Sequence, residues 1–135
     1  MLERLRAILA ARGLAGIALA EADVLQLDAL PGGWTDYDLI VSASMLEYVP
    51  PDRLADALRQ LRARLGRDGS LVLFITRRNP FTRWLVGRWW QSNLYNASEL
   101  TAAFSAAGFS EFCFRSFPTV ARRMALWGYI VEAKR

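Results

Sequence analysis

Hydrophobic and polar positions along the first part of the chain change their period from one segment to the next. Residues 2–12 repeat apolar side chains at helical spacing and lead into Gly13, which predicts an amphipathic helix. Residues 17–22 form a short apolar run that predicts a buried strand, and the Pro-Gly-Gly of residues 31–33 predicts a loop. Residues 37–42 then have the composition of a second strand.

The remaining segments alternate between helical and extended patterns. Residues 50–65 begin with Pro-Pro-Asp and repeat leucine at helical spacing, and residues 96–108 predict another helix that ends in glycine. Residues 70–76 are nearly all apolar, as in strands of a parallel sheet that are buried on both faces. Residues 109–117 and 125–133 predict two closing strands, which should pair antiparallel because no helix separates them.

This succession of strands and helices predicts the fold class. It is typical of an α/β, Rossmann-like sheet that is mostly parallel and carries an antiparallel pair of strands at its carboxyl end. A chain of 135 residues with 53% hydrophobic and 22% charged residues fits one globular domain, residues 1–135.

Composition excludes several classes of protein. The chain contains no histidine and a single cysteine, Cys113, which argues against a zinc or iron–sulfur site and predicts a cytoplasmic protein. No apolar run is long enough to predict a transmembrane helix. The net charge of +4 is modest, so a nucleic-acid partner is not expected.

A run of small residues, Ser42 to Ser44, ends the strand predicted at residues 37–42. Small residues at this position let a ligand approach the backbone, and ligands of open α/β sheets bind at the carboxyl ends of strands. A tight strand-to-helix turn is the alternative interpretation. The stretch alone favours neither.

Three longer segments resemble the class I S-adenosylmethionine-dependent methyltransferases. They are ADVLQLDALP, YDLIVSASMLEYVPPDRLADALRQLRARLGRDGSLVLFIT and YNASELTAAFSAAGF, in the order and at the spacing of that family's carboxyl-terminal two thirds. Each segment alone is common, and the combination carries the resemblance.

The resemblance implies S-adenosylmethionine as cofactor. Asp23 would accept a hydrogen bond from the adenine amino group, and the backbone amide of Val24 would donate to the ring. The small residues at the strand end would lie along the methionine part of the cofactor. The implied cofactor-binding residues are Asp23, Val24, Ser42, Ala43, Ser44 and Leu46. For Asp23, a turn or capping role is the alternative.

The resemblance also implies residues for the methyl acceptor. Glu47 is the candidate catalytic base, with a surface or capping glutamate as the alternative. The arginine- and tryptophan-rich residues 77–90 allow three interpretations: a cap over an apolar or aromatic acceptor, a segment that binds a membrane surface, or a nucleic-acid contact. The candidate acceptor-binding residues are Tyr48, Trp84, Trp89 and Tyr95.

The family's glycine-rich loop and its ribose-binding acid would precede Met1, so the chain resembles an amino-terminally truncated or split methyltransferase. We expect it to be inactive alone. The strand at residues 17–22 would lack its neighbours and the strand at 37–42 would have an open edge. Either these two strands pair directly, or a second copy or a complementing amino-terminal chain fills the edge.

Two functional hypotheses follow. The first is methyl transfer from S-adenosylmethionine to a small, apolar or aromatic acceptor, as part of a truncated or split enzyme. The second is a non-catalytic, methyltransferase-like module that binds a partner chain or a membrane surface.

Overall fold

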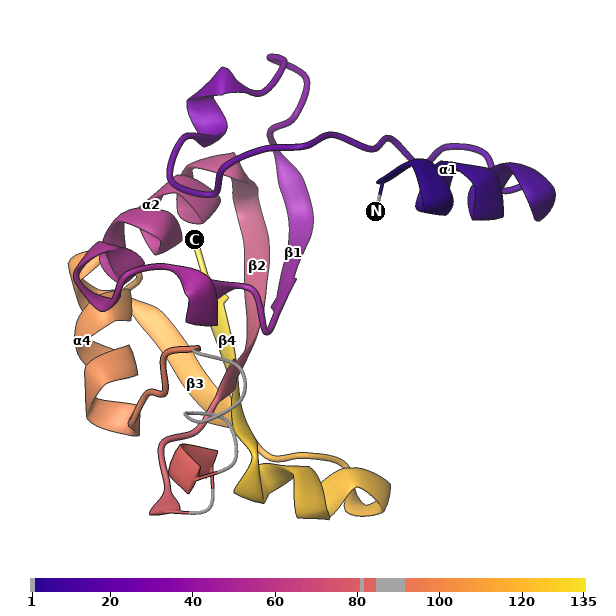
Figure 1. Cartoon of the computed structure of the whole chain (residues 1–135). Helices are drawn as coiled ribbons and strands as arrows, with labels where there is room; N and C mark the ends of the chain where they lie inside the picture. The colour runs from indigo at the N-terminus through magenta and orange to yellow at the C-terminus, as the bar shows by residue number, and fades with distance from the viewer. Residues whose placement is uncertain (1, 81, 85–91) are drawn as a thin grey trace.

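The strands of the protein form one mixed sheet. The computed structural model describes residues 2–80, 82–84 and 92–135 (Figure 1). Within them, four strands pair in the order β1-β2-β4-β3. Their bounds are β1 (Tyr37–Ala43), β2 (Leu65–Thr76), β3 (Glu111–Arg115) and β4 (Gly128–Lys134). β1 and β2 are parallel, whereas β4 is antiparallel to β2 and to β3. Three strands therefore run in one direction and β4 in the other, which confirms the predicted fold class.

The helices differ in how they relate to this sheet. The α-helices with described bounds are α1 (Leu2–Ala11), α2 (Leu54–Arg64) and α4 (Ala97–Ala106). The short 3-10 helices are η1 (Leu27–Ala29), η2 (Leu46–Tyr48), η3 (Pro51–Arg53) and η4 (Thr119–Leu126). α2 and α4 lie side by side on one face of the sheet, while α1 lies apart from it (Figure 1).

The core lies between the sheet and the α2–α4 pair. Alternate residues of β2, including Leu71 and Leu73, point to this face and are fully buried. Leu58 of α2 and Phe104 of α4 are also fully buried, and the Phe104 ring stacks on Phe112 of β3 at 5.3 Å between centroids. Each such side chain contributes roughly 1.5–3 kcal/mol through the area it removes from water.

α4 has defined signals at both ends. The Asn96 side chain accepts a hydrogen bond from the Glu99 amide, and the Glu99 carboxylate accepts one from the Asn96 amide, which completes a capping box. Gly108 follows the helix with a φ of 89°, a conformation that favours glycine. Asn96 is therefore the N-terminal cap of α4.

The opposite face of the sheet carries no helix among the described residues. Leu39 and Val41 of β1 point to this face and are 56% and 57% exposed. α1 is amphipathic, as predicted, yet none of its residues is buried. Both an apolar sheet face and an apolar helix stripe are therefore available for further packing.

The prediction of a strand at residues 17–22 is wrong. These residues form no strand, and Ile17 is 53% exposed. Among the described strands, β1 pairs with β2 alone and its other edge is open, so the expected direct pairing of residues 17–22 with β1 is also wrong. A strand needs a hydrogen-bonded neighbour, and no described strand lies beside this run.

Two other strands begin at different residues than the sequence predicts. β2 begins at Leu65 instead of residue 70, with a shift of register against β1. The shift brings Gly69 so close to the Tyr37 carbonyl that a Cβ there would lie 2.4 Å from its oxygen. Only glycine fits this approach. β4 begins at Gly128 and not at residue 125, because η4 occupies the residues before it.

Candidate ligand-binding end of the sheet

The carboxyl ends of β1 and β2 lie next to each other (Figure 1), and the small residues Ser42 to Ser44 form the end of β1 and the position after it. The Ser44 amide donates to the Phe74 carbonyl at 2.9 Å, which extends the ladder to the end of the strand. Ser44 has a φ of 50°, a left-handed conformation that is uncommon for residues other than glycine. Such conformations cluster at ligand-binding sites. The turn thus has more strain than an ordinary strand-to-helix connection requires.

The predicted cofactor contacts at this end separate into accessible and buried side chains. Ala43 and Ser44 are exposed, and so is Met45. Ser42 is only 3% exposed, faces the helix-covered side, and its hydroxyl has no hydrogen-bond partner among the described residues. Leu46 is fully buried in the core, so its side chain presents no surface to a ligand.

Glu47 is buried and held by the end of β2. Glu47 is only 4% exposed. Its Oε1 accepts hydrogen bonds from the Thr76 amide at 3.0 Å and from the Thr76 hydroxyl at 2.7 Å. Its carbonyl accepts from the Asn93 amide at 2.8 Å. Glu47 is therefore neither a surface glutamate nor a helix cap. Sequence reasoning missed Thr76, although a hydroxyl that ends an apolar strand was a usable signal.

Tyr95, like Glu47, is hydrogen-bonded to Thr76. It is 3% exposed, and its amide donates to the Thr76 carbonyl at 3.3 Å. Its phenolic oxygen is buried without a hydrogen-bond partner in the described part of the chain. Burial raises the pKa of the Tyr95 phenol, and the Glu99 and Glu47 carboxylates raise that pKa further. The hydroxyl is therefore protonated near neutral pH and is an unused hydrogen-bond donor.

The predicted acceptor-binding residues do not share one cavity. Tyr95 lines a groove between α2 and α4, whereas Trp84 lines a separate hollow with Pro80 and Arg83. Tyr48 and Trp84 are 62% and 68% exposed. Trp89 lies outside the described residues.

Asp23 takes part in its own turn. Its Oδ1 accepts a hydrogen bond from the Leu25 amide at 2.9 Å, and Asp23 is exposed. Val24 is half-buried against the core. An aspartate that bonds to the backbone two residues on favours the turn interpretation, while its exposure leaves the carboxylate accessible to a ligand.

A third hollow joins the segment after β2 to η4. The Arg77 amide donates to the Trp127 carbonyl at 2.8 Å, and the Asn79 side chain donates to the Leu126 carbonyl at 2.6 Å. The Arg77 guanidinium also lies 5.3 Å from the centroid of the Tyr129 ring. The hollow has a volume of about 690 Å³ and is lined by Arg77, Asn79, Pro80, Arg123, Leu126 and Trp127.

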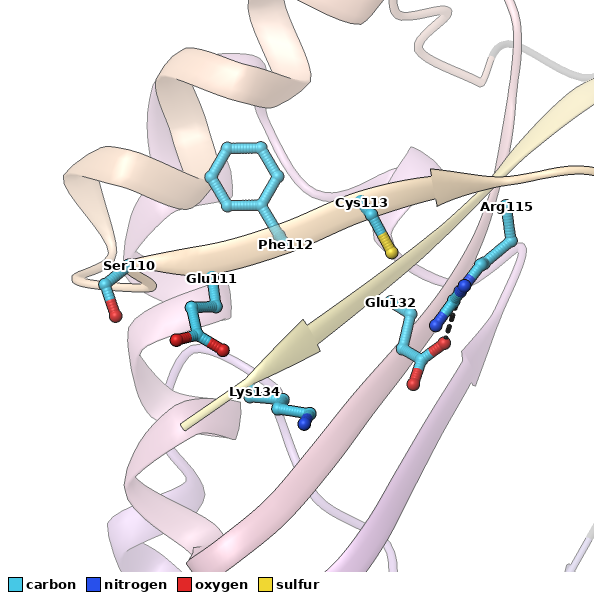
Figure 2. Close-up of a pocket in the computed structure, with 7 residues that line it drawn as sticks. All are labelled: Ser110, Glu111, Phe112, Cys113, Arg115, Glu132 and Lys134. Atoms are coloured by element: carbon cyan, nitrogen blue, oxygen red, sulfur yellow. Dashed lines mark hydrogen bonds and ion pairs between the residues drawn. The ribbon is translucent and has the colours of Figure 1, made fainter.

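A further depression lies on the uncovered face of β3 and β4. Figure 2 shows Glu111, Cys113 and Lys134 pointing to this face, while Phe112 points the other way. The Arg115 guanidinium pairs with the Glu132 carboxylate at 2.7 Å across the two strands. This is an alternating, charged sheet surface that lies away from the carboxyl ends of β1 and β2.

The described residues contain no group of three or more His, Cys, Asp or Glu arranged to hold a metal ion. Among these same residues, no helix has the length and apolarity needed to cross a membrane.

Comparison with known proteins gives matches in structure only. No protein-family model and no curated protein matches the sequence. PigF, in a structure with SAH, is 22% identical with a TM-score of 0.77 over 98% of this chain and 40% of its own. The S-adenosylmethionine-dependent methyltransferase SibL is 19% identical with a TM-score of 0.76 over 99% and 40%. An O-methyltransferase family protein from Burkholderia thailandensis is 14% identical with a TM-score of 0.70 over 98% and 40%.

These similarities establish the fold. The mixed sheet of this chain, with β4 reversed, therefore has the fold of the solved structures that it matches. The chain spans about two fifths of the length of the solved structures that it matches. The resemblance carried by the three sequence segments is thereby confirmed at the level of the fold.

Proposed function

We propose that this chain forms the carboxyl-terminal part of an S-adenosylmethionine-dependent methyltransferase that acts on a small, apolar or aromatic acceptor. The observation that carries the proposal is the end of β1. There, small accessible residues and the left-handed Ser44 meet the carboxyl end of β2, beside the reversed β4. Among the similar structures, PigF is bound to SAH, the product that remains when S-adenosylmethionine has given up its methyl group.

The proposal assigns two described parts of the chain to such a cofactor. Asp23 offers an exposed carboxylate to an adenine amino group, and Ala43 and Ser44 offer exposed backbone to the methionine part. When bound, the cofactor supplies a methyl group on a positively charged sulfur. The chain's own contribution is to hold both reactants in line and to exclude water from them.

The acceptor is proposed to lie at the same end of the sheet. The 690 Å³ hollow beside Arg77 and Leu126 opens there, and it is lined mostly by apolar surface. Glu47 does not line this hollow, and it is proposed as the base because the two Thr76 donors fix its carboxylate at the end of β2, where Arg77 of the hollow follows in sequence. Tyr95, the other candidate contact, lies in the groove between α2 and α4 and not in this hollow.

The cofactor site is proposed to be completed by a glycine-rich segment and a ribose-binding acid that the family carries ahead of the segments found here. This part would come from preceding sequence or from another chain, and residues 1–135 would form one partial domain with it, in the cytoplasm. It would also cover the open edge of β1 and the exposed Leu39 and Val41.

Calorimetric titration with SAH tests the proposal. The genome is first read upstream of the codon for Met1, and any glycine-rich segment in the same or the neighbouring gene is co-expressed. We expect the 135-residue chain alone to bind roughly ten- to a hundredfold more weakly than the complex, because the lost charge-assisted hydrogen bonds are worth about 1.5–3 kcal/mol each. Micromolar binding by the chain alone would show that these residues hold the cofactor unaided.

A non-catalytic module remains the second candidate. It is favoured by the engagement of Asp23 with Leu25 and by the burial of Glu47 against Thr76, since both carboxylates already have partners in the chain. A complex that assembles with the upstream segment but binds no SAH would select this candidate.

A further inference from the structure

η4 is a helix without a buried side. None of its residues is buried, and Val120, Met124 and Leu126 are 99%, 54% and 66% exposed. A run of eight residues of 3-10 helix is long for this type of helix. Large aliphatic side chains on a protruding segment usually mark a surface that contacts another apolar phase or molecule.

The residues around these side chains are basic. Residues 76–98 and 112–131 contain arginine repeatedly and no aspartate or glutamate. In the described part of the chain, Arg122 and Arg123 of η4 are exposed, and so is Arg83. Exposed apolar and cationic side chains thus occur together, with no acidic residue within either segment.

The two segments form one continuous surface. The hydrogen bonds from Arg77 and Asn79 tie the segment after β2 to the last turn of η4 and to Trp127. Trp84 lines a hollow that shares Asn79 and Pro80 with the hollow beside Leu126. Figure 1 shows η4 and the residues after β2 at the same end of the molecule. We name this surface, made of η4, Arg77, Arg83, Trp84 and Trp127, the basic apolar end.

We propose that the basic apolar end docks on an anionic phospholipid surface. Tryptophan and aliphatic side chains insert at the level of the headgroups, while arginines on the same element pair with lipid phosphates. Bases or phosphates of a nucleic acid would leave Val120 and Leu126 without a partner. A symmetric contact between two copies would bring Arg122 and Arg123 against the same arginines of the second copy.

The docking end is also the end at which the carboxyl ends of β1 and β2 open. If the proposed methyl transfer holds, this arrangement suits an acceptor dissolved in the lipid layer. This second statement rests on the proposed function, whereas lipid docking does not.

Vesicle flotation with the purified 135-residue chain tests the docking. The probes are vesicles of phosphatidylcholine alone and of phosphatidylcholine mixed with phosphatidylglycerol, without cofactor or acceptor. We expect the chain to float only with the mixed vesicles and to be released by salt, because a higher ionic strength shortens the range of the attraction. Equal flotation with both vesicles, or with neither, would overturn the proposal.

Two double variants separate charge from apolar contact. Arg122→Gln with Arg123→Gln should weaken binding roughly 30-fold, from about fivefold per arginine near an anionic surface. Val120→Ser with Leu126→Ser should weaken it about tenfold or more. All four side chains are exposed, so circular dichroism should show an unchanged fold.

Matched controls lie at the other end of the molecule. Arg67→Gln with Lys134→Gln removes the same charge at the opposite end of the sheet, and Leu14→Ser with Ile17→Ser removes exposed aliphatic groups before β1. Both controls should float like the parent chain. The proposal is wrong if the controls lose flotation as the η4 variants do. It is also wrong if the parent chain binds no vesicles and Val120→Ser with Leu126→Ser abolishes its self-association. If the parent chain floats as expected but its complex with the upstream segment binds no SAH, the proposed function alone is refuted.

Discussion

Glu47 shows how a single carboxylate can connect two elements. One oxygen accepts both the amide and the hydroxyl of Thr76, so the 3-10 helix η2 is fixed to the last residue of β2. Hydrogen bonds to a charged acceptor are worth about 1.5–3 kcal/mol each, more than those between neutral groups. Glu47 thus stabilises this end of the sheet, and substitution can separate that role from the proposed one as a base.

Glu47→Gln and Glu47→Ala make this separation. Glu47→Ala leaves both Thr76 donors unpaired and should lower the free energy of unfolding by about 1–3 kcal/mol in urea titration. Glu47→Gln keeps a carbonyl acceptor and should cost less. In the reconstituted enzyme, however, it should lower kcat by roughly 10²–10⁴-fold if Glu47 is the base.

Thr76→Val is the matched control, since it removes one donor to Glu47 and no carboxylate. An enzyme with Glu47→Gln and unchanged kcat would assign Glu47 to structure only.

Asp23→Ala tests the other carboxylate. In the reconstituted enzyme it should weaken SAH binding by about 1–3 kcal/mol, because the adenine amine loses its acceptor. The melting temperature should hardly change. Asp52→Ala, also at an exposed aspartate, should alter neither quantity. A clear fall in melting temperature with unchanged affinity would show that the Leu25 bond is the role of Asp23.

At the scale of elements, α4 is stabilised by reciprocal hydrogen bonds at its first turn. Asn96→Ala should lower the free energy of unfolding by about 1 kcal/mol, the usual cost of losing an N-terminal cap. Urea denaturation measures this. Ser98→Ala removes only an exposed donor to the Asn96 side chain and should cost clearly less. If both variants lower the free energy of unfolding equally, the hydrogen bond from the Ser98 hydroxyl, and not the one from the Glu99 amide, stabilises the helix end.

Elements with local signals could be predicted from the sequence. α2 and α4 were found from apolar spacing, Pro51 and Gly108, and β1 and β2 from their aliphatic runs. The prediction of a strand at residues 17–22 is wrong because an apolar run becomes a strand only beside a partner strand. η4 is not predicted, because none of its residues is buried and no core-facing apolar stripe marks a helix there.

The site was less predictable than the elements. Ser42 to Ser44 and Glu47 do lie at the carboxyl ends of β1 and β2, as expected from the order of elements alone. The direction of each side chain depends on strand phase, which buries Ser42 and exposes Ala43. The contacts of Glu47 with Thr76 and of Asn79 with Leu126 join residues far apart in sequence. No local pattern encodes such contacts.

At the scale of the whole molecule, two surfaces of the sheet are open to further contacts. In the part of the chain that the structure describes, β1 has a free edge, and the face of the sheet opposite α2 and α4 exposes Leu39 and Val41. A free edge with aliphatic residues is prone to pair with another strand. The direct pairing with residues 17–22 does not occur, which leaves association with a second copy or with a complementing chain.

We therefore expect association through β1. Light scattering should show the purified chain growing in mass with concentration, and hydrogen exchange at residues 38–42 should slow as it does. Addition of the upstream segment should give the same protection in a complex of fixed mass. A monodisperse monomer with rapidly exchanging amides at 38–42 would show that the edge is tolerated unpaired.

Cys113 turns the uncovered face into a chemical reporter. It is the only cysteine of the chain, it is exposed, and its thiol points to that face (Figure 2). A thiol-specific dye should label one defined position without any mutagenesis. Its labelling rate should fall severalfold when another layer of protein covers β3 and β4, and should stay unchanged when only the edge of β1 is paired. One colorimetric measurement thus distinguishes a partner that extends the sheet from one that lies across it.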